Sequence, residues 1–264
     1  MMYNHKPMQD GKLWCTCGIF KAPKNKDCRS VWRSIPILLL ISISSTVMFT
    51  LIAISANQYT ASFIDTEISN WFSVVENVFP QVMSWISFFG SGEVLMILTA
   101  LLMLWLSLKK KAYAQTLFVA VVMGGGVLLN LGLKFLFQRG RPEDSSYFEV
   151  FGYTFEWVSY SFPSGHAMRA FLFWALIIHL IWLYVRHTRT KIIFSLLFVL
   201  LILFIGSSRV LLDAHFPTDI LAAFAISLAW LTLCLAGFRI YYEKRLRKEQ
   251  RENLKMRENL CGRS

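Results

Sequence analysis

Charge is scarce in this sequence. Only 16% of its 264 residues are Asp, Glu, Lys or Arg, whereas 55% are hydrophobic, and the mean hydropathy is +0.48. Soluble domains contain about 25% charged residues, so the composition argues against a soluble domain and indicates a membrane protein. The chain also lacks an internal repeat. Its one low-complexity segment is the tail "EKRLRKEQRENLKMRE", which we expect to form a helix of alternating charges.

Apolar runs long enough to cross a bilayer, about 17–25 residues each, recur six times. None shows the strict alternation that is typical of a strand, so all six are predicted to be helices. We expect an all-α, polytopic membrane protein with six transmembrane helices in a bundle, in which residues 34–238 form the membrane domain between an N-terminal segment (1–33) and a charged tail (239–264). The predicted spans are Ile35–Ile54, Gly92–Leu108, Tyr113–Phe137, His166–Val185, Ile192–Ser208 and Asp219–Phe238.

Basic residues are missing between Arg33 and Lys109. They cluster instead before the first span, after the second and fourth spans, and in the tail, which are all on one side of a six-span protein. Basic loops stay in the cytoplasm, so both termini are expected there. The net charge of +11 then reflects topology and attraction to anionic lipids, and no nucleic-acid or obligate protein partner is needed to explain it. No apolar stretch precedes a cleavage site, so we expect no cleaved signal peptide.

Cysteines are few, and three of the five, Cys15, Cys17 and Cys28, lie in the N-terminal segment. A cytoplasmic location favours free thiols over disulfides. Together with His5 these residues could bind zinc, but their spacing matches no standard zinc finger, and we expect no metal.

The connection after the first span contains apolar residues at helical spacing. It forms either an amphipathic helix at the membrane interface or a loop that packs on the ends of the spans. The residues in question are Trp71, Phe72, Val75, Val78 and Phe79.

Three polar clusters fall on the side opposite the basic loops. The first is "KFLFQRGRP", in which Lys134 and Arg141 lie seven residues apart and could share one face of a helix. Pro142 is expected to end that helix. Arg139 fits a cation that extends to the membrane boundary. Three cations on the side where basic residues are otherwise avoided indicate an anionic ligand.

The second cluster is "PSGH", at the start of the fourth span. Pro163 suits a first helical turn, and Ser164 is a good capping residue. The backbone N–H groups of Ser164, Gly165 and His166 would then face outward at the positive end of the helix, where anions bind. Gly165 would let a ligand approach the backbone closely.

The third cluster is "SRVLLDAHFPTD", which contains Arg209. His215 and Asp219 lie four residues apart, so the carboxylate can reach the imidazole at the start of the sixth span. A carboxylate that binds one ring nitrogen leaves the other as a nucleophile or base. Two histidines among several cations indicate phosphate chemistry, since cationic donors match phosphoryl oxygens.

In this order, K-x6-RP, PSGH and SR-x5-H-x3-D resemble the three motifs of the type 2 phosphatidic acid phosphatase superfamily, with every defining position matched. The resemblance implies a metal-independent lipid phosphatase that uses no cofactor and acts at the extracytoplasmic face of the cytoplasmic membrane. It implies that His215 is the nucleophile, Asp219 orients it, and His166 is the general acid and then base. The implied phosphate-binding residues are Lys134, Arg141, Ser164, Gly165 and Arg209.

Two residues depart from the usual family pattern. Arg169 stands one turn beyond His166, where a small residue is common, and either contacts a second phosphate or extends to the membrane boundary. Asp213 stands where glycine is frequent, and either perturbs His215 or pairs with Arg209.

The leading hypothesis is a phosphatase for a lipid phosphate or diphosphate, with undecaprenyl diphosphate as the first choice of substrate. Phosphatidylglycerol phosphate and phosphatidic acid come next. A lipid phosphotransferase would use the same site with an alcohol in place of water. A protein that only binds anionic lipid would not need the nucleophile, the acid and the orienting carboxylate together.

Overall fold

A computed structural model describes residues 28–56, 63, 65–71, 80–108, 112–140, 147–150, 153–156 and 160–261 of the chain. Residues 65–71 form a short helical segment without a label. The labelled helices and strands are α1 (Cys28–Ala56), α3 (Pro80–Phe88), α4 (Gly92–Leu108), α5 (Tyr113–Phe137), β1 (Tyr147–Val150), β2 (Tyr153–Glu156), α6 (Gly165–Tyr184), α7 (Thr188–Leu211) and α8 (Pro217–Cys261).

Some residues named above lie outside the described part of the chain. These are His5, Cys15, Cys17, residues 72–79 of the first connection, Lys109 to Lys111, Arg141 and Pro142.

Six helical spans among the described residues are long and apolar enough to cross a membrane. They confirm the predicted number and order of spans. The second begins earlier than predicted, at Gln81, because α3 joins α4 through a tight turn at residues 89–91, and the last continues to Arg245. The spans are Ser34–Ala56, Gln81–Leu108, Tyr113–Phe137, Gly165–Tyr184, Thr188–Leu211 and Pro217–Arg245.

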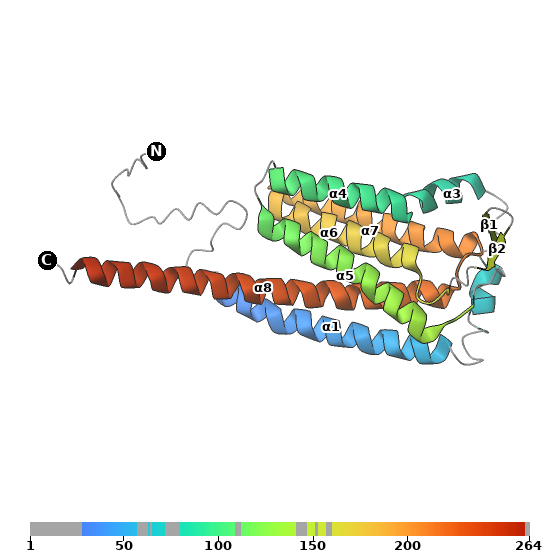
Figure 1. The fold of residues 1–264 in the computed structure, drawn as a ribbon, viewed down its shortest axis with the longest axis horizontal. Helices are drawn as coiled ribbons and strands as arrows, with labels where there is room; N and C mark the ends of the chain where they lie inside the picture. The colour runs from blue at the N-terminus through green and yellow to red at the C-terminus, as the bar shows by residue number, and fades with distance from the viewer. Residues whose placement is uncertain are drawn as a thin grey trace.

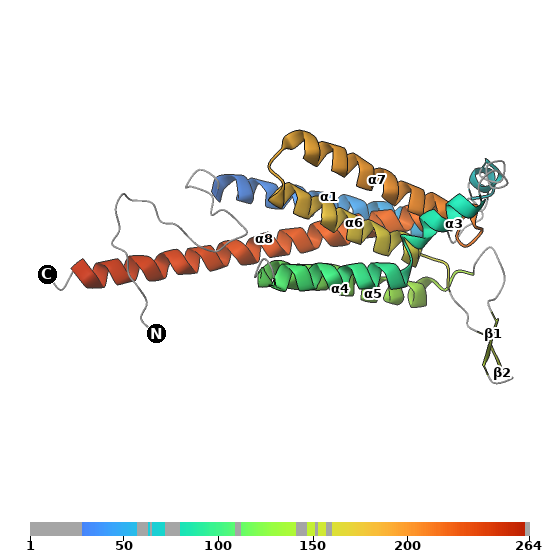
Figure 2. The same ribbon diagram turned by 90° about the horizontal axis from the view of Figure 1, so that it is seen from above.

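Helix α8 is the core of the bundle. It contacts α1 along much of its length and also packs against α5, α6 and α7 (Figures 1 and 2). Its apolar span is 56% buried, the largest share of the six spans. Small residues permit this close packing, since Ala222, Ala223 and Ala225 are almost fully buried.

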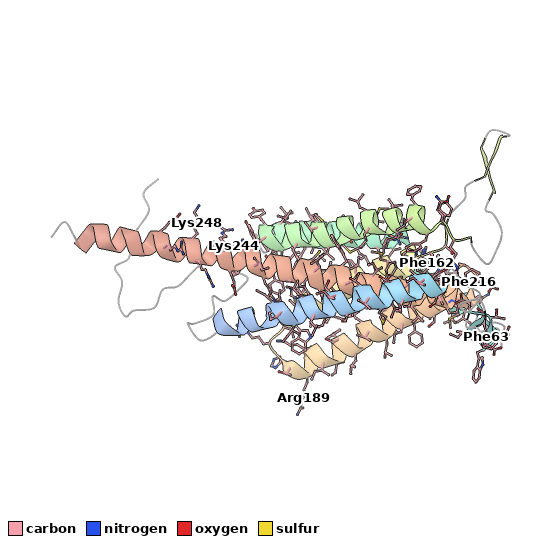
Figure 3. The ribbon with its side chains drawn as sticks, turned by 90° about the horizontal axis from the view of Figure 1, so that it is seen from below. Phe63, Phe162, Arg189, Phe216, Lys244 and Lys248 are labelled. Atoms are coloured by element: carbon pink, nitrogen blue, oxygen red, sulfur yellow. The ribbon has the colours of Figure 1, made fainter. Side chains whose placement is uncertain are left out.

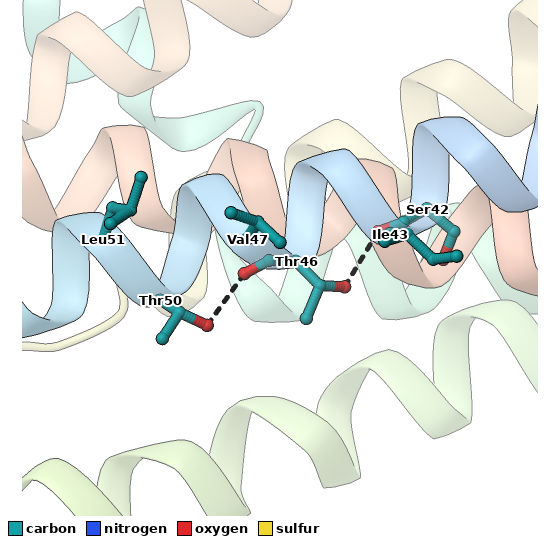
Figure 4. A pocket seen from close by; sticks show the side chains of 6 residues that line it. All are labelled: Ser42, Ile43, Thr46, Val47, Thr50 and Leu51. Carbon is teal, nitrogen blue, oxygen red and sulfur yellow. Dashed lines mark hydrogen bonds between the residues drawn. The ribbon is translucent and has the colours of Figure 1, made fainter.

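Helix α1 carries a row of hydroxyl side chains through the apolar region (Figure 4). Thr46 and Thr50 donate to the carbonyl oxygens of Ser42 and Thr46, at 2.8 and 2.9 Å. Ser42 instead donates to the carbonyl oxygen of Ala229 on α8, at 2.9 Å. These bonds satisfy each hydroxyl without water, and the last one fixes α1 against α8.

The two ends of the bundle differ in composition. Helices α5 and α7 end, and α6 and α8 begin, at one end, which includes Phe162 and Phe216 (Figures 1 and 3). Arg189, Lys244 and Lys248 lie toward the opposite end, with the start of α1 and the end of α8 (Figure 3). The connections that carry the three motifs therefore share the end away from these basic residues.

An antiparallel hairpin interrupts the connection between α5 and α6. Its strands pair Tyr147 with Glu156 and Val150 with Tyr153. The hairpin projects beyond the helices (Figure 2). The sequence does not predict these strands, because four residues are too short to show a clear alternation of apolar and polar side chains. The all-helical bundle is confirmed for the membrane domain.

The contact between α5 and α8 yields a stability prediction. Trp230 on α8 donates to the carbonyl oxygen of Val122 at 3.0 Å, and its ring covers Gly125, where a Cβ atom would lie 2.3 Å from the indole. Replacing Gly125 with Ala should therefore displace Trp230 and cost about 1–3 kcal/mol. We expect a melting temperature several degrees lower in detergent, as measured by thermal unfolding.

Gly124 is a matched control for this substitution. A Cβ atom there would meet nothing within 4 Å, so Gly124→Ala should leave the melting temperature unchanged or raise it slightly, because Ala favours helix more than Gly does. Equal melting temperatures for the two variants would show that Trp230 does not restrict Gly125.

Candidate active site

Backbone hydrogen bonds bring the three motif segments together. The N–H of Ser161 donates to the carbonyl oxygen of Arg139 at 2.8 Å, which joins the first segment to the second. The N–H of Ser164 donates to the carbonyl oxygen of Asp219 at 3.2 Å, which joins the second to the third. Because these bonds hold main chain to main chain, they position the segments independently of side-chain rotamers.

Ser164 is the N-cap of α6. Its hydroxyl accepts from the N–H of Ala167 at 3.5 Å, and helix α6 begins at Gly165. Pro163 lies before the cap, after a cis peptide bond, and not in the first turn as expected. The prediction that the N–H of Ser164 faces an outside ligand is wrong, because Asp219 accepts it. His166 lies in the first turn of α6 and is partly buried.

His215 and Asp219 form the predicted contact at the start of α8. Nδ1 of His215 lies 3.4 Å from Oδ2 of Asp219, at the long end of the hydrogen-bond range. The same oxygen accepts from the N–H of Phe216 at 3.1 Å. His215 is 3% exposed and Asp219 is fully buried. With Nδ1 facing the carboxylate, Nε2 is the ring nitrogen left for chemistry.

Arg139 neutralises the buried carboxylate of Asp219. Its Nη1 donates to Oδ1 of Asp219 at 2.8 Å, and its Nη2 donates to Oδ2 of Asp65 at 2.7 Å. The guanidinium also lies over the ring of Phe216, with 4.3 Å from Cζ to the ring centroid. Arg139 was interpreted from sequence as a cation that extends to the membrane boundary. That interpretation is wrong, because the guanidinium bridges two buried acids.

Asp65 is the residue that sequence reasoning missed. It is 2% exposed and accepts from the N–H and the hydroxyl of Thr218, both at 2.9 Å. An isolated buried acid is costly, so its position depends on Arg139 and Thr218. Its only signal in the sequence is an acid in the first connection, which does not identify its partners.

The first motif is not continuous helix. Helix α5 ends at Phe137, and Gln138 adopts a left-handed conformation with φ 47°. The prediction that Lys134 and Arg141 share one helical face is therefore wrong, although Arg141 itself lies outside the described residues. Lys134 remains in the last turn and donates from Nζ to the carbonyl oxygen of Tyr160, just before the second motif.

Arg209 lies in the last turn of α7 and contacts two neighbouring segments. Its Nη1 donates to the hydroxyl of Ser87 on α3 at 2.8 Å, and its carbonyl oxygen accepts from the N–H of His215 at 3.2 Å. The chain thus turns back on itself between Arg209 and His215. Asp213 in this turn is exposed and has φ 46°. Glycine suits that conformation better than aspartate does, which explains the glycine of the usual pattern.

A cavity of about 290 Å³ adjoins His215. Asp65 and Asp213 contribute two carboxylates to its walls, so it suits water or another polar neutral group better than a phosphate. The other lining residues are Thr66, Ser69, Asn70, Arg139 and Phe216. Within the described ranges, no three His, Cys, Asp or Glu side chains gather in a group that could hold a metal ion, and metal independence stays a prediction to be tested.

The charge network yields a second stability prediction. Replacing Arg139 with Met should leave Asp65 and Asp219 buried without their cation, at a cost of about 3–5 kcal/mol. We expect the melting temperature in detergent to fall on the order of 10 °C. Adding Asp65→Asn should restore part of the loss.

Arg189→Met is the control, because Arg189 is exposed at the opposite end of the bundle. An unchanged melting temperature for Arg139→Met would contradict the stabilising role of the network.

Comparison with known proteins extends these observations. A family model for the PAP2 superfamily matches residues 115–242. Phosphatidylglycerophosphatase B of Bacillus subtilis (strain 168) is 30% identical over 163 residues, which cover 60% of this chain and 74% of the relative. The crystal structure of a transmembrane PAP2-type phosphatidylglycerolphosphate phosphatase from Bacillus subtilis matches with a TM-score of 0.63 and 25% identity, over 77% of this chain and 96% of that one. The family suggested by the motifs is confirmed, and the chain belongs to the PAP2 superfamily as a multi-pass membrane lipid phosphatase.

Proposed function

We propose that this enzyme hydrolyses a lipid phosphomonoester or diphosphate through a phosphohistidine on His215. The observation that carries the proposal is the buried pair of His215 and Asp219, fixed by Arg139 beside the N-terminus of α6. Asp65 and Asp219 carry two negative charges and Arg139 one positive charge, so the group facing His215 has a net charge of −1. That charge stabilises the positive imidazole that forms when His215 attacks phosphorus.

In the first step, Nε2 of His215 forms a bond to phosphorus as the bond to the lipid oxygen breaks. His166 donates a proton to the leaving oxygen, which departs as the lipid alcohol from a phosphomonoester or as the lipid monophosphate from a diphosphate. Lys134, Arg141 and Arg209 neutralise the phosphoryl oxygens, while the hydroxyl of Ser164 and the N–H of Gly165 hold them near the positive end of α6. Asp219 keeps the proton of His215 on Nδ1.

In the second step, water attacks phosphorus and His166 accepts its proton. The bond between phosphorus and Nε2 breaks, phosphate leaves, and His215 returns to its neutral form. The two histidines and water account for every proton and electron pair, and the proposed steps use no metal.

The two relatives bear on the choice of substrate. Both are named for phosphatidylglycerophosphate, which favours phosphatidylglycerol phosphate over undecaprenyl diphosphate, the first choice from sequence alone. Undecaprenyl diphosphate is the second candidate because Arg169 adds a cation next to the second motif. A lipid phosphotransferase would show lipid-to-lipid phosphate transfer when an acceptor alcohol is supplied.

We also propose that the site faces away from the cytoplasm. The motif connections lie at the opposite end of the bundle from Arg189, Lys244 and Lys248 (Figure 3), and basic ends remain cytoplasmic.

His215→Ala should abolish phosphate release in the presence of EDTA, because it removes the proposed acceptor of the phosphoryl group. The measurement is phosphate release from phosphatidylglycerol phosphate, undecaprenyl diphosphate and phosphatidic acid by purified protein in detergent.

His187→Ala is the matched control, since His187 is exposed at the N-cap of α7. Full activity of His215→Ala would contradict the assignment of His215 as the nucleophile. Loss of activity of the parent enzyme with EDTA would contradict metal independence.

The orientation is tested with a C-terminal green fluorescent protein, which folds in the cytoplasm but not after export in unfolded form. Bright cells are expected, because α8 carries the basic tail to the cytoplasmic side. A fusion that fluoresces only when a further transmembrane span is inserted before it would reverse the proposed orientation.

A further inference from the structure

We propose that Arg169 binds a second phosphoryl group of the substrate, so that lipids with two phosphates are preferred over lipids with one. The inference rests on the proposed function, since it assigns a substrate class to the same site. The two phosphates can be adjacent, as in a diphosphate, or separate, as in phosphatidylglycerol phosphate.

The side chain of Arg169 extends toward the start of α6. In a helix, side chains lean toward the N-terminus, and Gly165 lies one turn before Arg169. A Cβ atom at Gly165 would lie 3.1 Å from Nη1 of Arg169, and one at Gly92 would lie 3.6 Å from Nη2. The guanidinium therefore occupies space that two glycines leave open, at the beginnings of both α4 and α6.

Among the described residues, Arg169 is a partly buried cation without a hydrogen-bond partner. Its Nε is inaccessible and unsatisfied, and no hydrogen bond or ion pair joins the side chain to another of the described residues. A charged side chain within a transmembrane helix is costly and usually functional. No described side chain forms a hydrogen bond with this cation, whereas a phosphate would.

Two helix N-termini and a second arginine lie near the guanidinium. Ser91 caps α4 by accepting from the N–H of Val94 at 3.3 Å, so the positive ends of α4 and α6 both face this region. Arg209 reaches the last turn of α3, just before the α3–α4 connection, from α7 through its bond to Ser87. Arg169 and Arg209 thus approach residues 87–92 from two helices, and Arg209 is the residue proposed to bind the reacting phosphate.

The alternative to a phosphate-binding role is a structural role for Arg169, with Glu93 as its partner. Glu93 attracts Arg169 electrostatically, but it is exposed and forms no ion pair with it within the described residues. If Glu93 were the true partner, loss of Arg169 would affect every substrate equally. A second-phosphate site predicts an effect on one class of substrate only.

The test compares the parent, Arg169→Met and Arg169→Lys on four lipids. Phosphatidylglycerol phosphate and undecaprenyl diphosphate carry two phosphates, while phosphatidic acid and undecaprenyl phosphate carry one. For Arg169→Met, kcat/KM should fall about 10- to 100-fold on at least one of the two-phosphate lipids, as expected for loss of a charge-assisted bond. It should stay within about threefold on both one-phosphate lipids. Arg169→Lys should retain an intermediate preference.

Binding is measured separately from turnover. In a His215→Ala background, two-phosphate lipids should bind more tightly than one-phosphate lipids, and Arg169→Met should remove the difference. Because this readout does not need catalysis, it separates failure of this proposal from failure of the phosphatase mechanism. Whichever two-phosphate lipid responds to Arg169→Met shows whether the phosphates must be adjacent or separate.

The third measurement is the melting temperature of each variant. Removing a partly buried cation that no described residue pairs with should leave the melting temperature of Arg169→Met unchanged or raise it, with Arg189→Met as the control. Equal losses of kcat/KM on all four lipids, or a lower melting temperature with no change in preference, would overturn the proposal. So would a parent enzyme that prefers one-phosphate lipids.

Discussion

The buried carboxylate of Asp219 is the constraint on which the active-site end depends. A carboxylate with no water around it must be satisfied by protein donors, and here those donors come from His215, Phe216 and Arg139. Its own backbone carbonyl accepts from Ser164. One residue thereby fixes the orientation of the proposed nucleophile, the end of α5 and the cap of α6. The chemistry and the local fold are consequences of the same desolvated charge.

The rest of the bundle is organised to let helices approach closely in lipid. Water cannot drive helices together there, so packing of small residues and satisfied hydroxyl groups carry the association. Ser42 bonds across to α8, and Gly125 accommodates the indole of Trp230. This packing forms a rigid base, which matters because an imidazole nitrogen must be held within a fraction of an ångström of its attack position.

Features set by local sequence could be predicted, and those set by distant partners could not. Long apolar runs identify the spans, and the four-residue spacing of His215 and Asp219 indicates that the carboxylate at the start of α8 can reach the imidazole just before it. Arg139 was misinterpreted because its role depends on the left-handed turn at Gln138 and on Asp65, which lies 74 residues away. The early end of α5 was missed for a related reason. The sequence contains a proline that can stop the helix, but tertiary contacts stop it sooner.

Helix α8 is continuous, so its length sets the distance between its two ends across the membrane. From Asp219 to Arg245 the helix rises about 39 Å, slightly more than the hydrocarbon thickness of about 30 Å. If Arg245 lies among the headgroups of one leaflet, His215 and Asp219 lie among those of the other, where lipid phosphates already are. A substrate then needs only lateral diffusion to reach the nucleophile, and its acyl chains never have to leave the bilayer.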